Sequence, residues 1–185
     1  MKYVHLKVMV FMLAFSAGIF VGAHTAWAAS AEEIDRDARS TLEKLYVKSP
    51  AAKALGEKAS GILVFPGIVK GGFILGGQYG EGALLKQGRT AGYYNTVQLS
   101  YGLQAGLQKY GYALFFMNES AMNWLDKSDG WELGVGPTIV VVDVGVSGAA
   151  TTTTLQSQIY AFFFNQKGLM GGIGLQGTKI TKLDK

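Results

Sequence analysis

The sequence contains no cysteine, and its only two histidines, His5 and His24, lie near its start. A chain without cysteine can form neither a disulfide framework nor a thiolate nucleophile. If the segment that carries both histidines is removed after synthesis, a Ser-His-Asp triad and a Cys/His zinc site are excluded as well. Catalysis would then be limited to carboxylate pairs, Ser-Lys chemistry or an oxygen-ligated metal.

Residues 1–28 have the three parts of a secretory signal peptide. A short basic region precedes the apolar run Val8–Val21, and small residues follow at Ala26-Trp27-Ala28. The run has 14 residues, fewer than the about 20 that a membrane-spanning helix needs. The pattern therefore predicts a signal peptide cleaved after Ala28 and a single domain over residues 29–185. An uncleaved membrane anchor is the alternative.

The charge of the predicted domain is low and of mixed sign. Without Lys2 and Lys7, 15 of the 17 basic side chains remain against 13 acidic ones. The basic residues are scattered and form no stripe, which argues against a nucleic-acid partner. Asp126, Asp129 and Glu132 are better explained as solvated acids near a turn than as calcium ligands, because the D-x-D-x-D-G pattern is absent. We therefore predict no metal, no cofactor and no catalytic residue.

Two helices are predicted at the start of this domain. Ser30 and Glu33 fit a capping box, and apolar residues then recur at helical spacing, which predicts an amphipathic helix over about residues 31–47. Ser49-Pro50 can begin a second short helix, which we expect to end at Gly61.

The rest of the sequence predicts about seven to nine strands, since apolar residues now recur with a period near two and glycine interrupts them. Glycine totals 26 in the chain, and in strands it marks bends, bulges or close backbone contacts. We also expect a brief helix capped by Asn118, and a hairpin turn at residues 165–168 joining the last two strands. The expected strands are 62–65, stopped by Pro66-Gly67, then 71–86, one long strand through the alternation at 97–108, then 112–117, 131–136, 139–146, 159–164 and 169–181.

These elements predict an α+β fold. Its N-terminal helices pack on a strongly curled, largely antiparallel, glycine-rich β-sheet or barrel-like sheet with one short inserted helix. Aromatic side chains beside basic residues would form an apolar and basic lip suited to a lipid interface. The candidate lipid-binding residues are Lys70, Phe73, Lys86, Arg89, Lys167 and Lys179.

Several ordered motifs resemble the SYLF domain family, and the likeness runs from about Ala31 to Lys182. They are Ile62-Leu63-Val64-Phe65-Pro66, residues 69–77 (VKGGFILGG), residues 165–172 (NQKGLMGG) and residues 175–180 (LQGTKI). The resemblance implies a non-enzymatic domain that binds anionic lipids, including phosphoinositides, and in eukaryotic members also actin filaments. Export would separate this chain from actin, so we expect no actin partner. Residues 31–48 carry five acids and four bases, unlike the basic N-terminal segment of eukaryotic members, so the lipid contact can differ.

The sequence thus predicts an exported, non-enzymatic domain, periplasmic or secreted, that lies peripheral to a membrane and binds anionic phospholipid. Two alternatives stay open. Alternating strands behind a signal peptide also suit an integral outer-membrane β-barrel protein. An exported enzyme using carboxylate or Ser-Lys chemistry is the other.

Overall fold

The computed structural model describes residues 29–72, 75–101, 106–127, 129–142, 157–167, 175 and 177–185. Its helices are α2 (Ala31–Lys48), α3 (Pro50–Gly56) and α4 (Glu119–Met122), followed by the 3-10 helix η1 (Asn123–Asp126). The strands are β1 (Gly61–Gly72), β2 (Leu75–Lys86), β3 (Arg89–Tyr101), β4 (Gly106–Phe116), β5 (Trp131–Glu132), β6 (Ile139–Val142), β7 (Ile159–Lys167) and β8 (Lys179–Leu183).

Helix α2 confirms the predicted capping box. The Ser30 hydroxyl accepts the backbone N–H of Glu33, and the Glu33 carboxylate accepts the backbone N–H of Ser30. One stripe of the helix is buried against the sheet, as its spacing predicts. That stripe consists of Ile34, Ala38, Leu42 and Leu45.

Helix α3 begins as predicted but ends earlier. Ser49 caps it by accepting the backbone N–H of Ala52, and Pro50 occupies the first turn. The prediction that the helix reaches Gly61 is wrong, because it ends at Gly56 and Gly61 already pairs with Phe116 as the first residue of β1.

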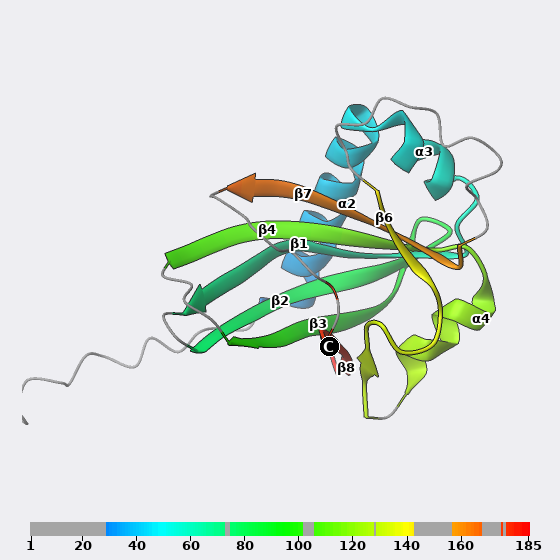
Figure 1. The fold of residues 1–185 in the computed structure, drawn as a ribbon. Helices are drawn as coiled ribbons and strands as arrows, with labels where there is room; N and C mark the ends of the chain where they lie inside the picture. The colour runs from blue at the N-terminus through cyan, green and yellow to red at the C-terminus, as the bar shows by residue number, and fades with distance from the viewer. Residues whose placement is uncertain are drawn as a thin grey trace, which may run out of the picture.

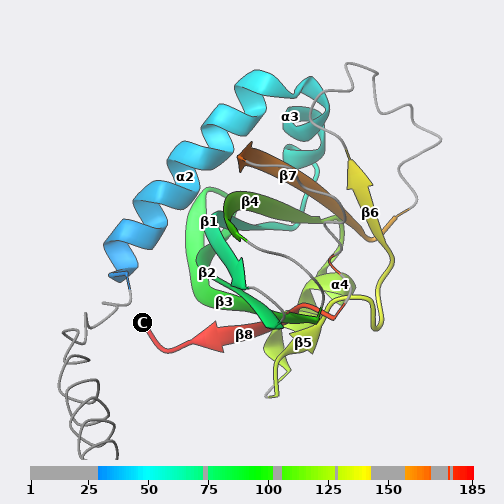
Figure 2. The ribbon, with the colours of Figure 1, turned by 60° about the vertical axis from the view of Figure 1, so that its left-hand side comes forward.

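The strands form one strongly curled half-barrel in the order β5-β8-β3-β2-β1-β4-β7-β6. Each neighbouring pair is antiparallel except β6 with β7, which is parallel. Helix α2 crosses the outside of the curled sheet, with α3 beyond its C-terminal end (Figure 1). Figure 2 shows β8 leading back towards the first turn of α2. The predicted α+β class and strand number are confirmed.

Strand β1 does not stop at Pro66-Gly67 as predicted. It continues to Gly72, and the proline and glycine lie in a bulge where three residues of β1 span two residues of β2 and of β4. A bulge bends a strand and increases its local twist, and Pro66 needs no ladder hydrogen bond there. The sheet therefore curls at this point.

Glycines on the neighbouring strands make this bend possible because they have no side chain that would clash with the β1 backbone. A Cβ on Gly82 of β2 would lie 2.3 Å from the carbonyl oxygen of Val64, and one on Gly111 of β4 would lie 2.7 Å from that of Phe65. The predicted use of strand glycines for close backbone contact is confirmed at both positions.

The two faces of the sheet carry separate cores. The inner face encloses an aromatic cluster that includes Phe65, Tyr112, Phe116 and Trp131. The outer face packs residues such as Val64, Ala83, Phe115 and Phe162 against the buried stripes of α2 and α3. Side chains alternate between the two faces along each strand.

Two further predictions about the strands are wrong. The single strand predicted through residues 97–108 is wrong, since β3 ends at Tyr101, β4 begins at Gly106, and β2 and β1 lie between them in the sheet, while residues 102–105 lie outside the described residues. The hairpin turn predicted at residues 165–168 is wrong at residues 165–167, which still belong to β7, and Lys167 pairs with Lys109 of β4, while residue 168 lies outside the described residues. Alternation and turn composition cannot reveal which strands are neighbours.

We expect Gly82→Ala to destabilise the fold by about 1–3 kcal/mol, because the added methyl group overlaps the β1 backbone and forces the bulge to move. Gly67→Ala is the matched control. Nothing lies within 4 Å of its Cβ position, so its effect should stay within about 0.5 kcal/mol. Urea unfolding followed by circular dichroism measures both. Equal stability of the two variants would contradict the proposed origin of the curl.

Candidate functional site

Strands β1 to β4 extend beyond the part of the sheet that the helices cover, and we call this the distal end. It comprises the last residues of β1 and β3 and the first residues of β2 and β4. Side chains that lie opposite one another in the ladder point to the same face of the sheet. The ladder aligns five of them in a row across the sheet, in the order Lys109, Val69, Tyr79, Val97 and Lys179.

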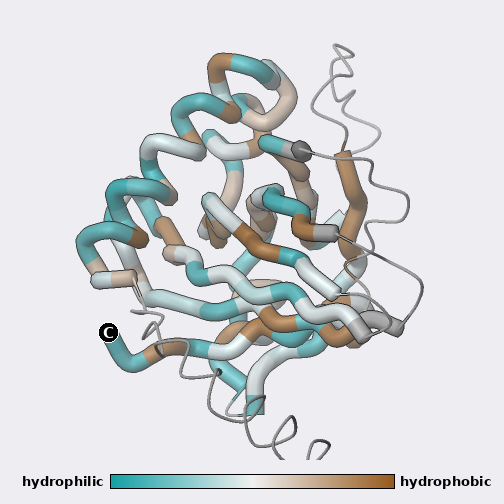
Figure 3. Tube along the Cα trace, turned by 90° about the vertical axis from the view of Figure 1, so that its left-hand side faces the viewer, coloured by the Kyte–Doolittle hydropathy of each residue, from teal (hydrophilic) through white to brown (hydrophobic). Residues whose placement is uncertain are grey.

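The outer face of the distal end is apolar and exposed. Leu99 and Leu107 have 77% and 71% of their surface accessible, although both lie in regular strands. We call the exposed apolar group the distal patch, and it consists of Val69, Tyr79, Val97, Leu99 and Leu107. Figure 3 looks onto this end of the half-barrel, where hydrophobic and hydrophilic segments alternate along the strands.

The inner face of the same strands is polar. Gln78 is buried and accepts a hydrogen bond from the Tyr110 hydroxyl. Thr96 and Tyr112 hydroxyls are 2.7 Å apart and share another hydrogen bond. Burial raises the pKa of Tyr110 to about 12, and it raises that of Tyr112 further, so both hydroxyls stay protonated at neutral pH. The usual arrangement, with apolar side chains inside and polar ones outside, is thus reversed at the distal end.

Beside the distal patch lies a groove of about 740 Å³ between α2 and the distal parts of β1 and β2. The helix contributes Glu33, Asp37 and Lys44, and the strands contribute Val69, Tyr79 and Glu81. The groove therefore has a charged helical wall, and its strand wall shares Val69 and Tyr79 with the distal patch.

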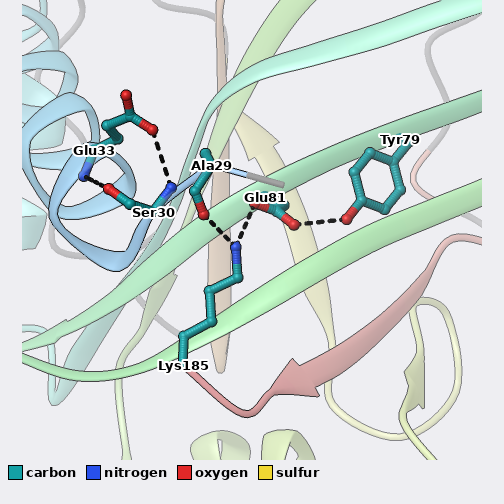
Figure 4. A network of polar contacts seen from close by, with 6 residues as sticks. All are labelled: Ala29, Ser30, Glu33, Tyr79, Glu81 and Lys185. Carbon is teal, nitrogen blue, oxygen red and sulfur yellow. Dashed lines mark hydrogen bonds and ion pairs between the residues drawn. The ribbon is translucent and has the colours of Figure 1, made fainter. Parts of the chain in front are cut away.

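Glu81 connects this groove to both ends of the described chain (Figure 4). Its carboxylate accepts the Tyr79 hydroxyl at 2.7 Å and the Lys185 ammonium at 2.8 Å, and Lys185 also donates to the carbonyl oxygen of Ala29. The side chains of Glu81 and Lys185 are 8% and 17% exposed, so water screens this ion pair only partly.

The titration of Glu81 reflects these partners. Burial alone would raise its pKa, but the hydrogen bonds from Lys185 and Tyr79, the charge of Lys185 and the backbone amide of Ala29 together hold it below its ordinary value. Burial and the neighbouring carboxylate raise the pKa of Tyr79 to about 12. Glu81 is therefore charged at neutral pH, and Tyr79 is the donor.

The structure places three of the six predicted lipid-binding residues at the distal end. Lys179 is exposed and lies next to Val97 on the outer face. Lys167 pairs with Lys109 through the β7–β4 ladder. Lys70 is half-buried and lies on the inner face, in register with Gln78.

The other three predicted residues are not brought to this end. Lys86 and Arg89 flank the β2–β3 turn at the opposite end of the strands, where Lys86 forms an ion pair with Glu119 at 3.4 Å. Phe73 lies outside the described residues. The six positions therefore do not form one surface, and their role in binding stays a prediction.

Sequence reasoning missed most of the distal patch. The alternation at Val97, Leu99 and Leu107 was visible, but alternation alone does not tell which face is covered. Tyr79 and Lys109 carry no motif, and only the strand register places them in the same row.

Neither a metal centre nor a membrane-spanning helix is found in the part of the chain that the structure describes. No three acidic or histidine residues there converge on a possible ion, and this includes Asp126, Asp129 and Glu132. None of the described helices combines the length and the apolar character needed to cross a membrane.

Comparison with known proteins shows that part of the chain is similar to one protein family. No curated protein is significantly similar to the chain. Residues 97–185 match the family described as Ysc84, Las17-binding protein actin regulator. This match begins within β3 and includes every strand that follows. It is consistent with a non-enzymatic domain. The resemblance to the SYLF (Ysc84) domain family is confirmed over residues 97–185, which contain the motifs at residues 165–172 and 175–180.

Proposed function

We propose that this protein is an exported, non-enzymatic domain that binds a lipid membrane through the distal patch. The observation that carries the proposal is the reversed polarity of the distal end, where regular strands present leucine to solvent and glutamine to the interior. A contiguous exposed apolar surface on a folded domain indicates a site that is covered when the protein functions.

The free energy of transferring exposed apolar side chains from water into lipid favours a membrane interface over the distal patch. Full burial of a leucine side chain is worth about 1.5–3 kcal/mol, and Leu99 and Leu107 both project from the same end of the sheet. Tyr79 combines an apolar ring with a hydroxyl, which suits the boundary between acyl chains and headgroups. The polar inner face stays out of the lipid, since its groups are satisfied inside the half-barrel.

Two lysines favour anionic headgroups. Lys109 and Lys179 are exposed at the two ends of the row that crosses the patch. Glu132 lies opposite Lys179 in the ladder, so the local charge is mixed. We therefore assign most of the affinity to apolar insertion and a smaller, salt-sensitive part to the lysines.

The family description refers to actin regulation and to binding of Las17. The predicted signal peptide would take this chain away from cytosolic actin, so membrane lipid is the partner that we propose. The polarity of the distal end supports the same choice, because an apolar strand surface suits a lipid interface.

Replacing both exposed leucines, Leu99→Ser with Leu107→Ser, should lower the partition of the protein onto anionic vesicles about tenfold or more, because their transfer from water into lipid is lost. Val47→Ser is the matched control, since Val47 is 86% exposed but lies at the end of α2. Co-sedimentation with phosphatidylglycerol-containing vesicles measures the partition. Unchanged binding of the double variant would contradict the proposal.

Removing the two flanking lysines, Lys109→Ala with Lys179→Ala, should weaken binding to anionic vesicles about tenfold at low salt. Each lysine contributes at most about 1 kcal/mol near a charged surface, and Glu132 offsets part of the charge of Lys179. Binding to neutral vesicles should stay the same. Lys86→Ala with Arg89→Ala removes equal charge at the opposite end and should have little effect. If the second pair weakened binding more than the first, the contact would lie at the β2–β3 turn.

A further inference from the structure

Ala29 lies close to the carboxylate of Glu81 because Lys185 bridges the two residues. The Lys185 ammonium donates to the carbonyl oxygen of Ala29 and, at 2.8 Å, to the Glu81 carboxylate. Ala29 is also half-buried against the outer core. The backbone amide of Ala29 is among the groups that lower the pKa of Glu81, which agrees with this geometry. Ala29 is thus held next to Glu81 before α2 begins.

Ala29 is also the residue at which the mature chain is predicted to begin. Ala29 directly follows Ala26-Trp27-Ala28, the small-x-small pattern at which a signal peptide is cut. Hydrolysis of the Ala28–Ala29 peptide bond consumes one water molecule and leaves a carboxylate on Ala28 and an ammonium group on Ala29. The nitrogen beside Glu81 would then change from a neutral amide to a cation.

We infer that the new N-terminal ammonium group of Ala29 binds the Glu81 carboxylate and that export processing thereby completes a charge cluster that fastens α2 to β2. Glu81 has the capacity for this partner. An ionised carboxylate offers about four acceptor positions, and the structure fills two of them with Tyr79 and Lys185. The side chain is 8% exposed, so an added charge partner acts where water screens it weakly.

The charged groups near Ala29 define the local balance of charge. Figure 4 shows Glu81 and Tyr79 from β2, Glu33 from the start of α2 and Lys185 from the segment after β8 around this residue. Asp37 and Lys44 of α2 line the same groove. Glu33 is engaged in the capping box, and Lys185 shares Glu81 as its acceptor. The three acidic side chains thus exceed the two lysines by one, so one further positive charge would balance them.

The consequence is that the processed protein is more stable than a precursor of the same fold. In the precursor, Ala29 presents a neutral amide near Glu81, whereas the processed chain places a full charge there. This increase in folding stability depends on pH. An ammonium group whose pKa is raised in the folded state stabilises the fold below its unfolded pKa of about 7.7–8.0, and this contribution is lost as pH rises through the folded value.

This inference rests on the proposed export and is independent of lipid binding. The test compares the protein beginning at Ala29, obtained by expressing the full chain and purifying the exported product, with the same protein carrying one additional glycine before Ala29. The extension keeps every side chain and moves the ammonium group by one residue, about 3.8 Å. Glu81→Gln in the exported protein removes the acceptor. NMR titration of the N-terminal residue, with carbon-13 alanine or glycine, measures the pKa of the ammonium group in each.

We expect the exported protein to begin at Ala29 and its ammonium group to have a pKa about one unit above that of the extended protein, whose value should be ordinary. Glu81→Gln should return the pKa of Ala29 to the ordinary range. The exported protein should also need more urea to unfold than the extended one at pH 7, and this difference should vanish at pH 10.5. An ordinary pKa for Ala29, equal unfolding midpoints at pH 7, or cleavage at another bond would overturn the inference.

These readouts separate the inference from the proposed function. Vesicle binding of the exported and extended proteins should be the same, because the distal patch is intact in both. If the ammonium group titrates normally while vesicle binding depends on Leu99 and Leu107, the lipid proposal stands alone. Should Glu81→Gln fail to fold, the comparison of the exported and extended proteins decides the question by itself.

Discussion

The curl of the sheet at the β1 bulge is the constraint on which the rest of this structure depends. Because three residues of β1 span two residues on either side, the sheet bends around its inner face and encloses a core of aromatic side chains. Gly82 and Gly111 permit the bend by leaving space for the β1 carbonyl groups. The outer face is consequently convex, and among the described residues α2 and α3 cover it.

Helix α2 is shorter than strands β1 to β4, against which it packs. Strands β1 to β4 have 11 to 13 residues, or roughly 36–43 Å, whereas α2 has 18 residues, or roughly 27 Å. Beyond the helices the outer face remains apolar while the inner face becomes polar, so the distal end is not built as an ordinary protein surface. A membrane interface would complete it, and the charge cluster at Glu81 marks the border between the helix-covered and the exposed part.

The helices and the strand-rich architecture could be predicted from the sequence because their signals are local. The capping box at Ser30 and the spacing of the buried α2 stripe depend on neighbouring residues alone. Pro66-Gly67 was interpreted as a strand end because a bulge and a turn use the same residues. The distal patch depends on register between strands far apart in sequence, so the sequence could not place Tyr79 in one row with Lys109. The alternation near Leu99 showed two unlike faces without showing which one the helices leave bare.

The most direct test of membrane insertion uses the absence of cysteine from the chain. Single variants Leu99→Cys, Leu107→Cys and Val47→Cys can each carry one nitroxide label, and electron paramagnetic resonance reports whether the label contacts oxygen in lipid or a nickel complex in water. On anionic vesicles, labels at positions 99 and 107 should become accessible to oxygen and protected from nickel, while the label at position 47 stays in water. Labels at 99 and 107 that remain in water on vesicle-bound protein would contradict insertion through the distal patch.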